Sequence, residues 1–329
     1  MKEVCVLVPT GEAVLSSIVG PFKLFNAANQ FVRQRDPEAI PPFDVKLLGI
    51  SSQTDLYGGS FLVRPHLILA DNPRPDLIII PAIQGNIHKE MENNKEFVPW
   101  IAERYKEGSE IASMCVGAFL LASSGLLDGK CCTTHWAMAG LFRETFPRVT
   151  LLSEKIITDE NGLYTSGGAY SFLNLMLYLV EKYAGRDIAI KCAKYFEVDM
   201  DRYNQSQFAI FSGQKEHADD PVLKAQNYIE ANVGEKLKVD DLANMCAISR
   251  RNFIRRFKKA THNTPLEYIQ RAKVEAAKKS LESSGATVYE VMYKVGYSDS
   301  KAFRNLFRKF TGLTPNEYRS KYNRSQAMA

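Results

Sequence analysis

The first two hundred residues alternate short apolar runs with stretches in which apolar residues recur every three or four positions. Runs of the first kind are typical of buried strands, and stretches of the second kind are typical of helices. We expect strands at 4–8, 43–50, 77–80 and 110–114, and helices at 18–32, 96–106, 117–124 and from 167 to about 182. Strands that alternate with helices in this way predict an α/β domain with a mostly parallel sheet, covered on both faces.

The last hundred residues follow a different pattern, because they contain no convincing strand-like run and have helical spacing throughout. They also contain a repeat with an offset of 50 residues. Eight of sixteen positions are identical between the two copies: Phe253, Phe257, Lys259, Thr261, Thr264, Pro265, Glu267 and Tyr268 recur as Phe303, Phe307, Lys309, Thr311, Thr314, Pro315, Glu317 and Tyr318. Since roughly one identity would arise by chance, we interpret this region as an all-α domain with a duplicated unit.

Each copy has the plan of a helix-turn-helix. A short amphipathic helix ends at small residues, at 246–248 in the first copy and 295–297 in the second, and such turns let two helices cross steeply. The next helix is expected to be capped by Ser249 in the first copy and by one of three residues in the second: Ser298, Asp299 or Ser300.

The second helix of each copy has an apolar face of phenylalanines and a polar face that suits the major groove of DNA. Arginine reads guanine edges, asparagine reads adenine, and lysine holds phosphates. The candidate DNA-binding residues are Ser249, Arg250, Arg251, Asn252, Arg255, Arg256 and Lys259, and, in the second copy, Ser298, Ser300, Lys301, Arg304, Asn305 and Arg308.

Both copies continue into Thr-Pro-x-Glu, which predicts a capping box at the start of a further helix. The first of these helices is expected to run from Pro265 to about Ser283. Its roughly eighteen residues span about 27 Å, a little less than the ~34 Å of one duplex turn. One chain is therefore expected to place two recognition helices in successive major grooves.

Charge divides the chain in the same way. From Pro221 onward Lys and Arg number 21 against 10 Asp and Glu, a net of +11, whereas the preceding residues carry 21 against 27, a net of −6. This asymmetry indicates that only the last part meets a polyanion. We expect domains at 1–205 and 221–329 with a polar linker at 206–220.

The cysteines and the apolar segments indicate the cellular compartment. Six cysteines without a CxxC pair argue against a disulfide framework and against a zinc site, and we expect neither a metal nor another cofactor. No segment approaches the ~20 apolar residues of a membrane helix, and the first apolar stretch is too short for a signal peptide. We expect a cytoplasmic, nucleoid-associated protein without membrane contact.

With these features in place, the sequence resembles the AraC/XylS family of transcription regulators over about residues 222–322. The segment SRRNFIRRFKKATHNTPLEYIQRAK is similar to the family's first recognition helix and linker helix, and VMYKVGYSDSKAFRNLFRKFTGLTPNEYR to its second unit. Two positions depart from the family pattern: Met292 replaces alanine, and Arg256 replaces an apolar residue. The resemblance implies binding to double-stranded promoter DNA and contact with RNA polymerase.

In the first domain, Cys115 stands at a sharp strand-to-helix turn, where a thiolate would be stabilised by helix N–H groups. The segment SMCVGAFLLASSGLLDGKCCTTHW resembles the PfpI-type, class I glutamine-amidotransferase-like superfamily, and more narrowly the GlxA-like regulators. This resemblance implies a flavodoxin-like three-layer sandwich. Enzymes of the superfamily place a histidine after the cysteine or a carboxylate before the first helix's GP pair, where this chain has Val116 and Ser17.

We therefore interpret Cys115 and His135 as vestiges of a catalytic site, in a protein that is not an enzyme. Ligand-binding candidates are Ser17, Gln84, Gly85, Cys115, Val116 and His135. Relatives of this type imply an amino acid or a quaternary amine as effector, and Trp136 or Phe119 could line a cation site. We expect a homodimer.

Three alternatives stay open at this point. The first is a cysteine-dependent amidase- or hydratase-type enzyme with an appended DNA-binding domain, which predicts a low pKa for the Cys115 thiol. The second is a first domain that only dimerises. The third is an architectural protein of the nucleoid, which would bind DNA with little sequence preference.

Overall fold

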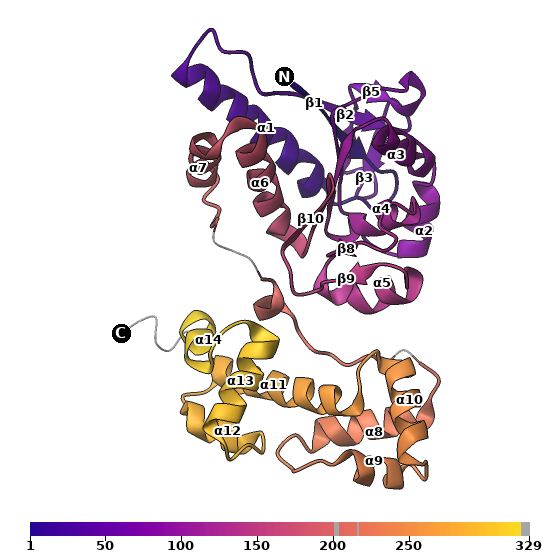
Figure 1. The fold of residues 1–329 in the computed structure, drawn as a ribbon, viewed down its shortest axis with the longest axis vertical. Helices are drawn as coiled ribbons and strands as arrows, with labels where there is room; N and C mark the ends of the chain where they lie inside the picture. The colour runs from indigo at the N-terminus through magenta and orange to yellow at the C-terminus, as the bar shows by residue number, and fades with distance from the viewer. Residues whose placement is uncertain (201–203, 216, 324–329) are drawn as a thin grey trace. The chain divides into compact units, whose positions relative to one another are not determined.

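The computed structural model describes residues 1–200, 204–215 and 217–323, and its chain separates into two compact units, Met1–Gln205 and Ser206–Ala329 (Figure 1). Residues 201–203, at the end of the first predicted domain, and 324–329, at the end of the last, lie outside the described residues.

The first unit is built on a seven-stranded sheet with the order β10-β11-β7-β6-β1-β2-β5. Every neighbouring pair is parallel except β10 and β11, which confirms the mostly parallel sheet expected from the sequence. Its strands are β1 (Lys2–Val8), β2 (Phe43–Gly49), β5 (Leu67–Ile68), β6 (Leu77–Ile80), β7 (Glu110–Met114), β10 (Ile157–Glu160) and β11 (Leu163–Ser166). Two short pairs lie outside it: β3 (Thr54–Leu56) with β4 (Phe61–Val63), and β8 (Cys131–Cys132) with β9 (Thr150–Leu151).

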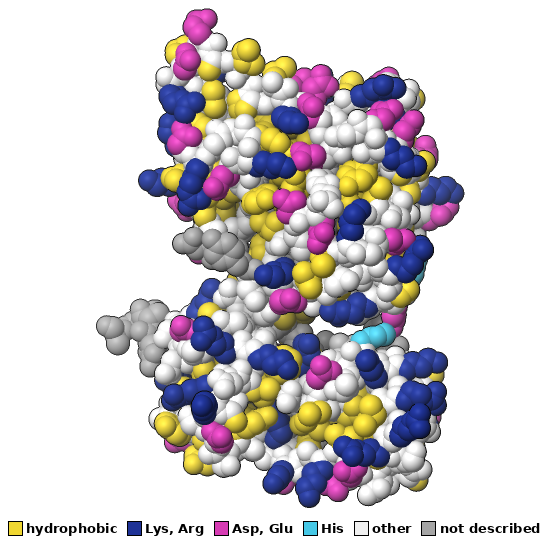
Figure 2. Space-filling view, in the orientation of Figure 1, with side chains coloured by type: hydrophobic (Ala, Val, Ile, Leu, Met, Phe, Trp, Pro, Cys, Tyr) yellow, Lys and Arg dark blue, Asp and Glu magenta, His cyan; other side chains and the backbone are white. Residues whose placement is uncertain are grey.

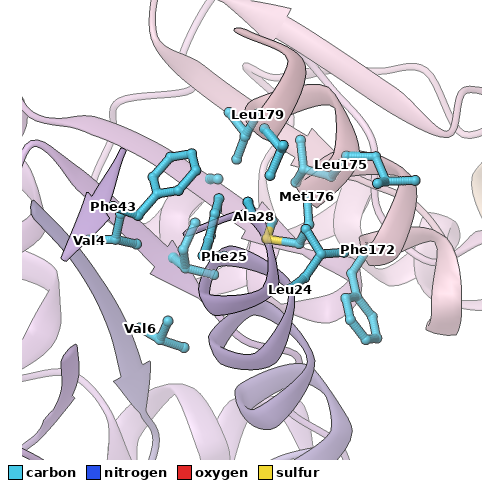
Figure 3. Packing of buried hydrophobic residues seen from close by; sticks show 14 of the residues in the cluster. Val4, Val6, Leu24, Phe25, Ala28, Phe43, Phe172, Leu175, Met176 and Leu179 are labelled. Atoms are coloured by element: carbon cyan, nitrogen blue, oxygen red, sulfur yellow. The ribbon is translucent and has the colours of Figure 1, made fainter. Parts of the chain in front are cut away.

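Helices cover both faces of this sheet and complete a three-layer sandwich of the flavodoxin-like type (Figure 1). One face carries α1 (Leu15–Arg35), α6 (Phe172–Ala184) and α7 (Arg186–Tyr195), and the other carries α2 (Ile87–Asn93), α3 (Phe97–Lys106), α4 (Ala118–Ser123) and α5 (Ala139–Thr145). Strand β1 contributes side chains to the cores on both faces of the sheet, since Val4 and Val6 point into one core and Leu7 into the other. Figure 3 shows the first core, where Phe25 and Met176 pack beside these valines.

The second unit consists of α8 (Asp220–Ala231), α9 (Val239–Met245), α10 (Arg250–Thr261), α11 (Pro265–Ser283), α12 (Val288–Lys294), α13 (Ser300–Thr311) and α14 (Pro315–Tyr322). No strand occurs among its described residues, as the sequence predicted. It has two separate cores, one per repeat, and α11 contributes to both: Tyr268 and Ile269 belong to the first core, and Ala277 and Leu281 to the second.

The segment predicted as a linker at 206–220 packs on the second unit. The ring of Phe211 lies edge-on to that of Tyr268, with centroids 4.9 Å apart, and the carbonyl of Ala209 accepts a 2.6 Å bond from the Lys278 ammonium. Asp219 then caps α8, which begins at Asp220. These two contacts hold the segment against the helices that follow it.

Candidate nucleic-acid interface and ligand site

Helix α10 shows a division between a buried face and a basic face. Phe253, Phe257 and Thr261 are buried, whereas Arg251, Arg255 and Lys259 follow one another at intervals of four and are exposed. Residues four apart lie on the same side of a helix, so these three cations form one stripe opposite the core. Figure 2 shows Lys and Arg side chains gathered over α10.

Helix α13 repeats this arrangement in the second unit of the repeat. Phe303, Phe307 and Thr311 are buried, and the exposed stripe contains Lys301, Asn305 and Lys309. Its N-terminus is capped by Asp299, one of the three residues predicted for this role. The Asp299 carboxylate accepts bonds from the Lys301 and Ala302 amides at 2.8 and 3.2 Å. In α10 the predicted cap residue Ser249 occupies the N-cap position, but its side chain makes no capping hydrogen bond there.

Most of the predicted DNA-binding residues are solvent-exposed in the structure. Ten are exposed: Ser249, Arg250, Arg251, Arg255, Lys259, Ser298, Lys301, Arg304, Asn305 and Arg308. Three are half-buried: Asn252, Arg256 and Ser300. The sequence interpretation left out Lys258 and Lys309, which are also exposed. The repeat itself could have identified both, since they are the counterparts of Arg308 and Lys259.

Arg256 does not fit its predicted role. Its guanidinium makes a bidentate pair with the Asp219 carboxylate, at 2.7 and 2.9 Å, and this pair holds the pKa of Asp219 below its ordinary value. Since Asp219 also accepts a bond from the Val222 amide at the start of α8, Arg256 fastens α8 to α10. Arg250 is likewise paired, with its Nε 3.2 Å from an Asp240 carboxylate oxygen, although both side chains remain largely exposed.

The capping boxes predicted at the two Thr-Pro-x-Glu motifs are confirmed. The Thr264 hydroxyl accepts a bond from the Glu267 amide, and the Glu267 carboxylate accepts one from the Thr264 amide at 2.9 Å, so α11 begins at Pro265 as expected. The Thr264 backbone bond lowers the pKa of Glu267. Thr314 and its partner do the same for α14. A third box at Thr287 starts α12, and its Thr-x-x-Glu spacing was legible in the sequence.

In the first unit, the candidate ligand residues gather at the carboxyl ends of β1, β6 and β7. Strand order reverses between β1 and β6, and ligands of open α/β sheets bind outside such switch points. The loops after these two strands are joined by a bridge between Ala13 and Ile83 and by a 2.7 Å bond from the Gln84 amide to the Glu12 carbonyl. Gly85 follows with φ +79°, a conformation that suits glycine.

Ser17 fastens the same two loops from the first turn of α1. Its hydroxyl donates to the Val14 carbonyl at 2.6 Å and accepts from the Ala82 amide at 3.0 Å, and the side chain is buried. A hydroxyl in this position brings no charge, and both of its bonds are to backbone. Ser17 therefore holds the site together and supplies no proton acceptor of carboxylate strength.

Cys115 lies directly after β7 at the sharp turn predicted for it. It adopts φ +54°, a left-handed conformation that is strained for a residue with a side chain. Gly117 allows this turn to sit against the end of β6, because a Cβ at Gly117 would lie 2.4 Å from the Pro81 carbonyl oxygen. Cys115 and Val116 are both buried, and burial raises the pKa of the Cys115 thiol to about 12. The thiol is therefore protonated at neutral pH.

His135 reaches the Cys115 turn through its neighbour. The Thr134 hydroxyl donates to the Cys115 carbonyl at 2.8 Å, and His135 Nδ1 accepts a 3.1 Å bond from the Ala137 amide. That bond leaves the ring proton on Nε2, and burial lowers the pKa of His135, so the imidazole is neutral at pH 7. The ring edge faces Gly168, where an added Cβ would lie 3.5 Å from Cδ2.

Gln205 is a buried residue of this site that sequence reasoning missed. Its side-chain amide donates to the Thr134 and Ser153 carbonyls at 2.9 and 3.0 Å, and its oxygen accepts from the Gly168 amide at 2.7 Å. The polar stretch around it predicted only a loop. No local signal distinguishes it, because all of its partners lie at least 37 residues away.

The chemistry of the site is that of hydrogen bonding by neutral groups. A protonated thiol and a neutral imidazole do not make the thiolate pair that nucleophilic catalysis requires. Phe119 is fully buried against Phe142 and cannot line a cation site, contrary to the sequence interpretation, whereas Trp136 is half-buried with its ring 5.2 Å from that of His135. The described residues contain no cluster of three metal-ligating side chains, and none of their helices has the length and apolarity of a membrane span.

Comparisons with known proteins agree with both halves of this description. A model of the DJ-1/PfpI family matches residues 46–182, and a helix-turn-helix domain model matches residues 242–321. The HTH-type transcriptional regulator GbdR of Pseudomonas aeruginosa is 26% identical over 248 residues, 75% of this chain and 66% of that protein. The HTH-type transcriptional regulator GlxA of Rhizobium meliloti is 24% identical over 213 residues, 64% of this chain and 65% of that protein.

The chain thus spans just under two thirds of the length of these relatives. A solved structure from Vibrio parahaemolyticus is 25% identical, covers 59% of this chain and 98% of that one, and superposes with a TM-score of 0.52.

Proposed function

We propose that this chain, which joins a DJ-1/PfpI domain to an AraC-type helix-turn-helix domain, is a sequence-specific DNA-binding transcription regulator controlled by a small metabolite. The observation that carries the proposal is the pair of matching stripes on α10 and α13. Each is a row of exposed polar side chains opposite two buried phenylalanines, with cations alone on α10 and cations and one amide on α13, as a helix inserted in a major groove requires.

The spacing of the two stripes supports the same function. Helix α11 joins the two helix-turn-helix units and has 19 residues, a length of about 28 Å. Its start is fixed by a capping box, and it is packed into both cores. Two recognition helices on such a rod suit successive major grooves, ~34 Å apart. We assign base and phosphate contacts to Arg251, Arg255, Lys259, Lys301, Arg304, Asn305 and Lys309.

We further propose that the first domain binds its effector at the Ser17, Gln84, Cys115 and His135 cluster without turning it over. Buried Cys115, with its raised pKa, supports binding without covalent chemistry. An amino acid or a quaternary amine fits a site with half-buried Trp136 and neutral hydrogen-bonding groups. The protein would work in the cytoplasm as a homodimer, at promoters that RNA polymerase also occupies.

Gln205 supplies a route for control. It is the last residue of the first unit, and its amide binds the loop that carries His135. A ligand that prefers one arrangement of this loop would change where the chain leaves the first unit, and a ligand acts only through such a difference in affinity.

The direct test is a mobility shift with promoter DNA from the genes that flank this one. Alanine at four exposed basic positions of α10 and α13 should abolish the specific complex: Arg251, Arg255, Lys301 and Arg304. The matched control replaces four exposed cations of the α/β domain, which should leave DNA binding intact: Lys23, Arg33, Arg64 and Arg74. Specific binding that survives in the first variant would refute the proposed readout.

A further inference from the structure

The two helix-turn-helix units have separate hydrophobic cores, so no shared core fixes the angle between them. Helix α11 contributes to both cores, but a single helix restrains rotation of each unit about its axis only through the side chains of its own faces. A direct bond between the two units would remove that freedom. The structure contains such a bond near the middle of α11.

Lys273 makes this connection. Its side chain is buried, and its ammonium donates three hydrogen bonds, to the carbonyls of Val233 and Glu235 at 2.6 and 2.8 Å and to that of Val295 at 2.8 Å. An ammonium has three N–H donors, and here all three are used on backbone oxygens. Burial lowers the pKa of Lys273, and the three carbonyl dipoles offset part of that cost.

The three carbonyls belong to different helix-turn-helix units. Val233 and Glu235 lie in the loop between α8 and α9 of the first helix-turn-helix unit, and Val295 lies in the turn between α12 and α13 of the second helix-turn-helix unit. That turn positions the start of α13. A single side chain on the connecting helix therefore holds a loop of one unit and the turn before the recognition helix of the other.

The backbones of these two segments also touch beside Lys273. A Cβ added to Gly296 would lie 2.4 Å from the Gly234 carbonyl oxygen and 2.8 Å from the Lys273 ammonium. A Cβ added to Gly234 would lie 3.0 Å from the Lys294 carbonyl oxygen. Gly296 has φ +73°, so glycine is favoured there by conformation as well as by space. The close approach is thus built from both sides.

We propose that Lys273 is a positioning residue that sets the spacing between the two DNA half-sites read by one chain. The inference rests on the proposed function, because it needs α10 and α13 to read DNA. Lys273 lies in the interior and touches no base. It acts by holding the second recognition helix at one distance and angle from the first, so that DNA with the right separation of half-sites binds without any rearrangement.

The same helix supplies a matched control. Lys278 is equally buried on α11, but it donates to the Ala209 carbonyl and to the neighbouring Glu275, neither of which belongs to the α12–α13 turn. Lys278→Met removes a buried ammonium of the same kind from the same helix and leaves the bond between the units intact.

The test is a selection of binding sites by the full chain from a double-stranded pool with a randomised segment of about 30 base pairs, roughly three duplex turns. We expect the wild type to enrich two half-sites at one separation, with about tenfold or greater preference over a separation changed by one base pair, because a displaced helix loses its base contacts. Lys273→Met should enrich the same half-sites over several separations, and Lys278→Met should keep the single separation.

Circular dichroism would establish that each variant is folded. If Lys273→Met does not fold, Lys273→Gln, which retains two N–H donors, carries the test and should also broaden the distribution. A sharp single separation in the folded Lys273 variants would overturn the inference, and so would equal broadening in Lys278→Met. A wild type that enriches no sequence would instead overturn the proposed function itself.

Discussion

The alkylation rate of Cys115 distinguishes a ligand-binding domain from a cysteine-dependent enzyme. The reactive form of cysteine is the thiolate, and burial raises the pKa of this thiol from 9.0 to about 12. At pH 8 the thiolate fraction would be about one in ten thousand, against roughly one in ten for a thiol with the ordinary pKa. Iodoacetamide should therefore modify Cys115 about a thousandfold more slowly in the folded protein than in the same protein unfolded in urea.

The measurement follows each cysteine by peptide mass spectrometry after timed alkylation, from pH 7 to 10. Cys131 is the internal control, since it is only half-buried and should be modified well before Cys115. The Cys115 rate should rise tenfold for each pH step of one across this range. A Cys115 rate that exceeds that of Cys131 and levels off below pH 8.5 would show that Cys115 is a thiolate near neutral pH and would favour the cysteine-dependent enzyme.

Three further perturbations follow from the contacts described above. Arg256→Met should lower the melting temperature and leave DNA affinity unchanged, whereas Arg255→Met should lower DNA affinity and leave the melting temperature unchanged. Because its pairing with Arg256 depresses the pKa of Asp219, the pair stabilises the fold above pH ~4, and this contribution disappears at lower pH. The melting temperatures of the wild type and of Arg256→Met should therefore converge as the pH falls below that value. Thr264→Ala should lose about 1 kcal/mol in urea unfolding of the DNA-binding unit, and no loss would contradict the capping assignment. Gly117→Ala should destabilise the first unit by about 1–3 kcal/mol, since its Cβ would strike the carbonyl after β6; an unchanged thermal midpoint would disprove that contact.

The sequence predicted best those elements whose signal is local. Strands β6 and β7 were placed to the residue: β6 is an uninterrupted apolar run between Asp76 and Pro81, and β7 is a short, mostly apolar run that ends at the Cys115 turn. Helix α11 was also placed correctly, since its capping box and the Ser-Ser-Gly at its end lie within the segment. The two recognition helices were recognisable because the repeat displays the same buried and exposed positions twice.

What the sequence could not predict depends on contacts between distant residues. Helix α6 was expected from Gly167 but begins at Phe172, after a 3₁₀ turn, and the Gly168 amide before it is held by Gln205. Arg256 was assigned to DNA because its partner Asp219 lies 37 residues away. Lys273 looks like an ordinary surface lysine of a helix, and only the fold reveals its three carbonyl partners.

We infer that α10 and α13 of one chain enter two neighbouring major grooves. Methylation protection of guanine N7 reads the major groove directly, and we expect two protected blocks about ten base pairs apart for each chain. Replacing Arg251 and Arg255 by alanine should remove one block, and replacing Lys301 and Asn305 should remove the other. A single block, or two blocks that both disappear with either variant, would contradict it.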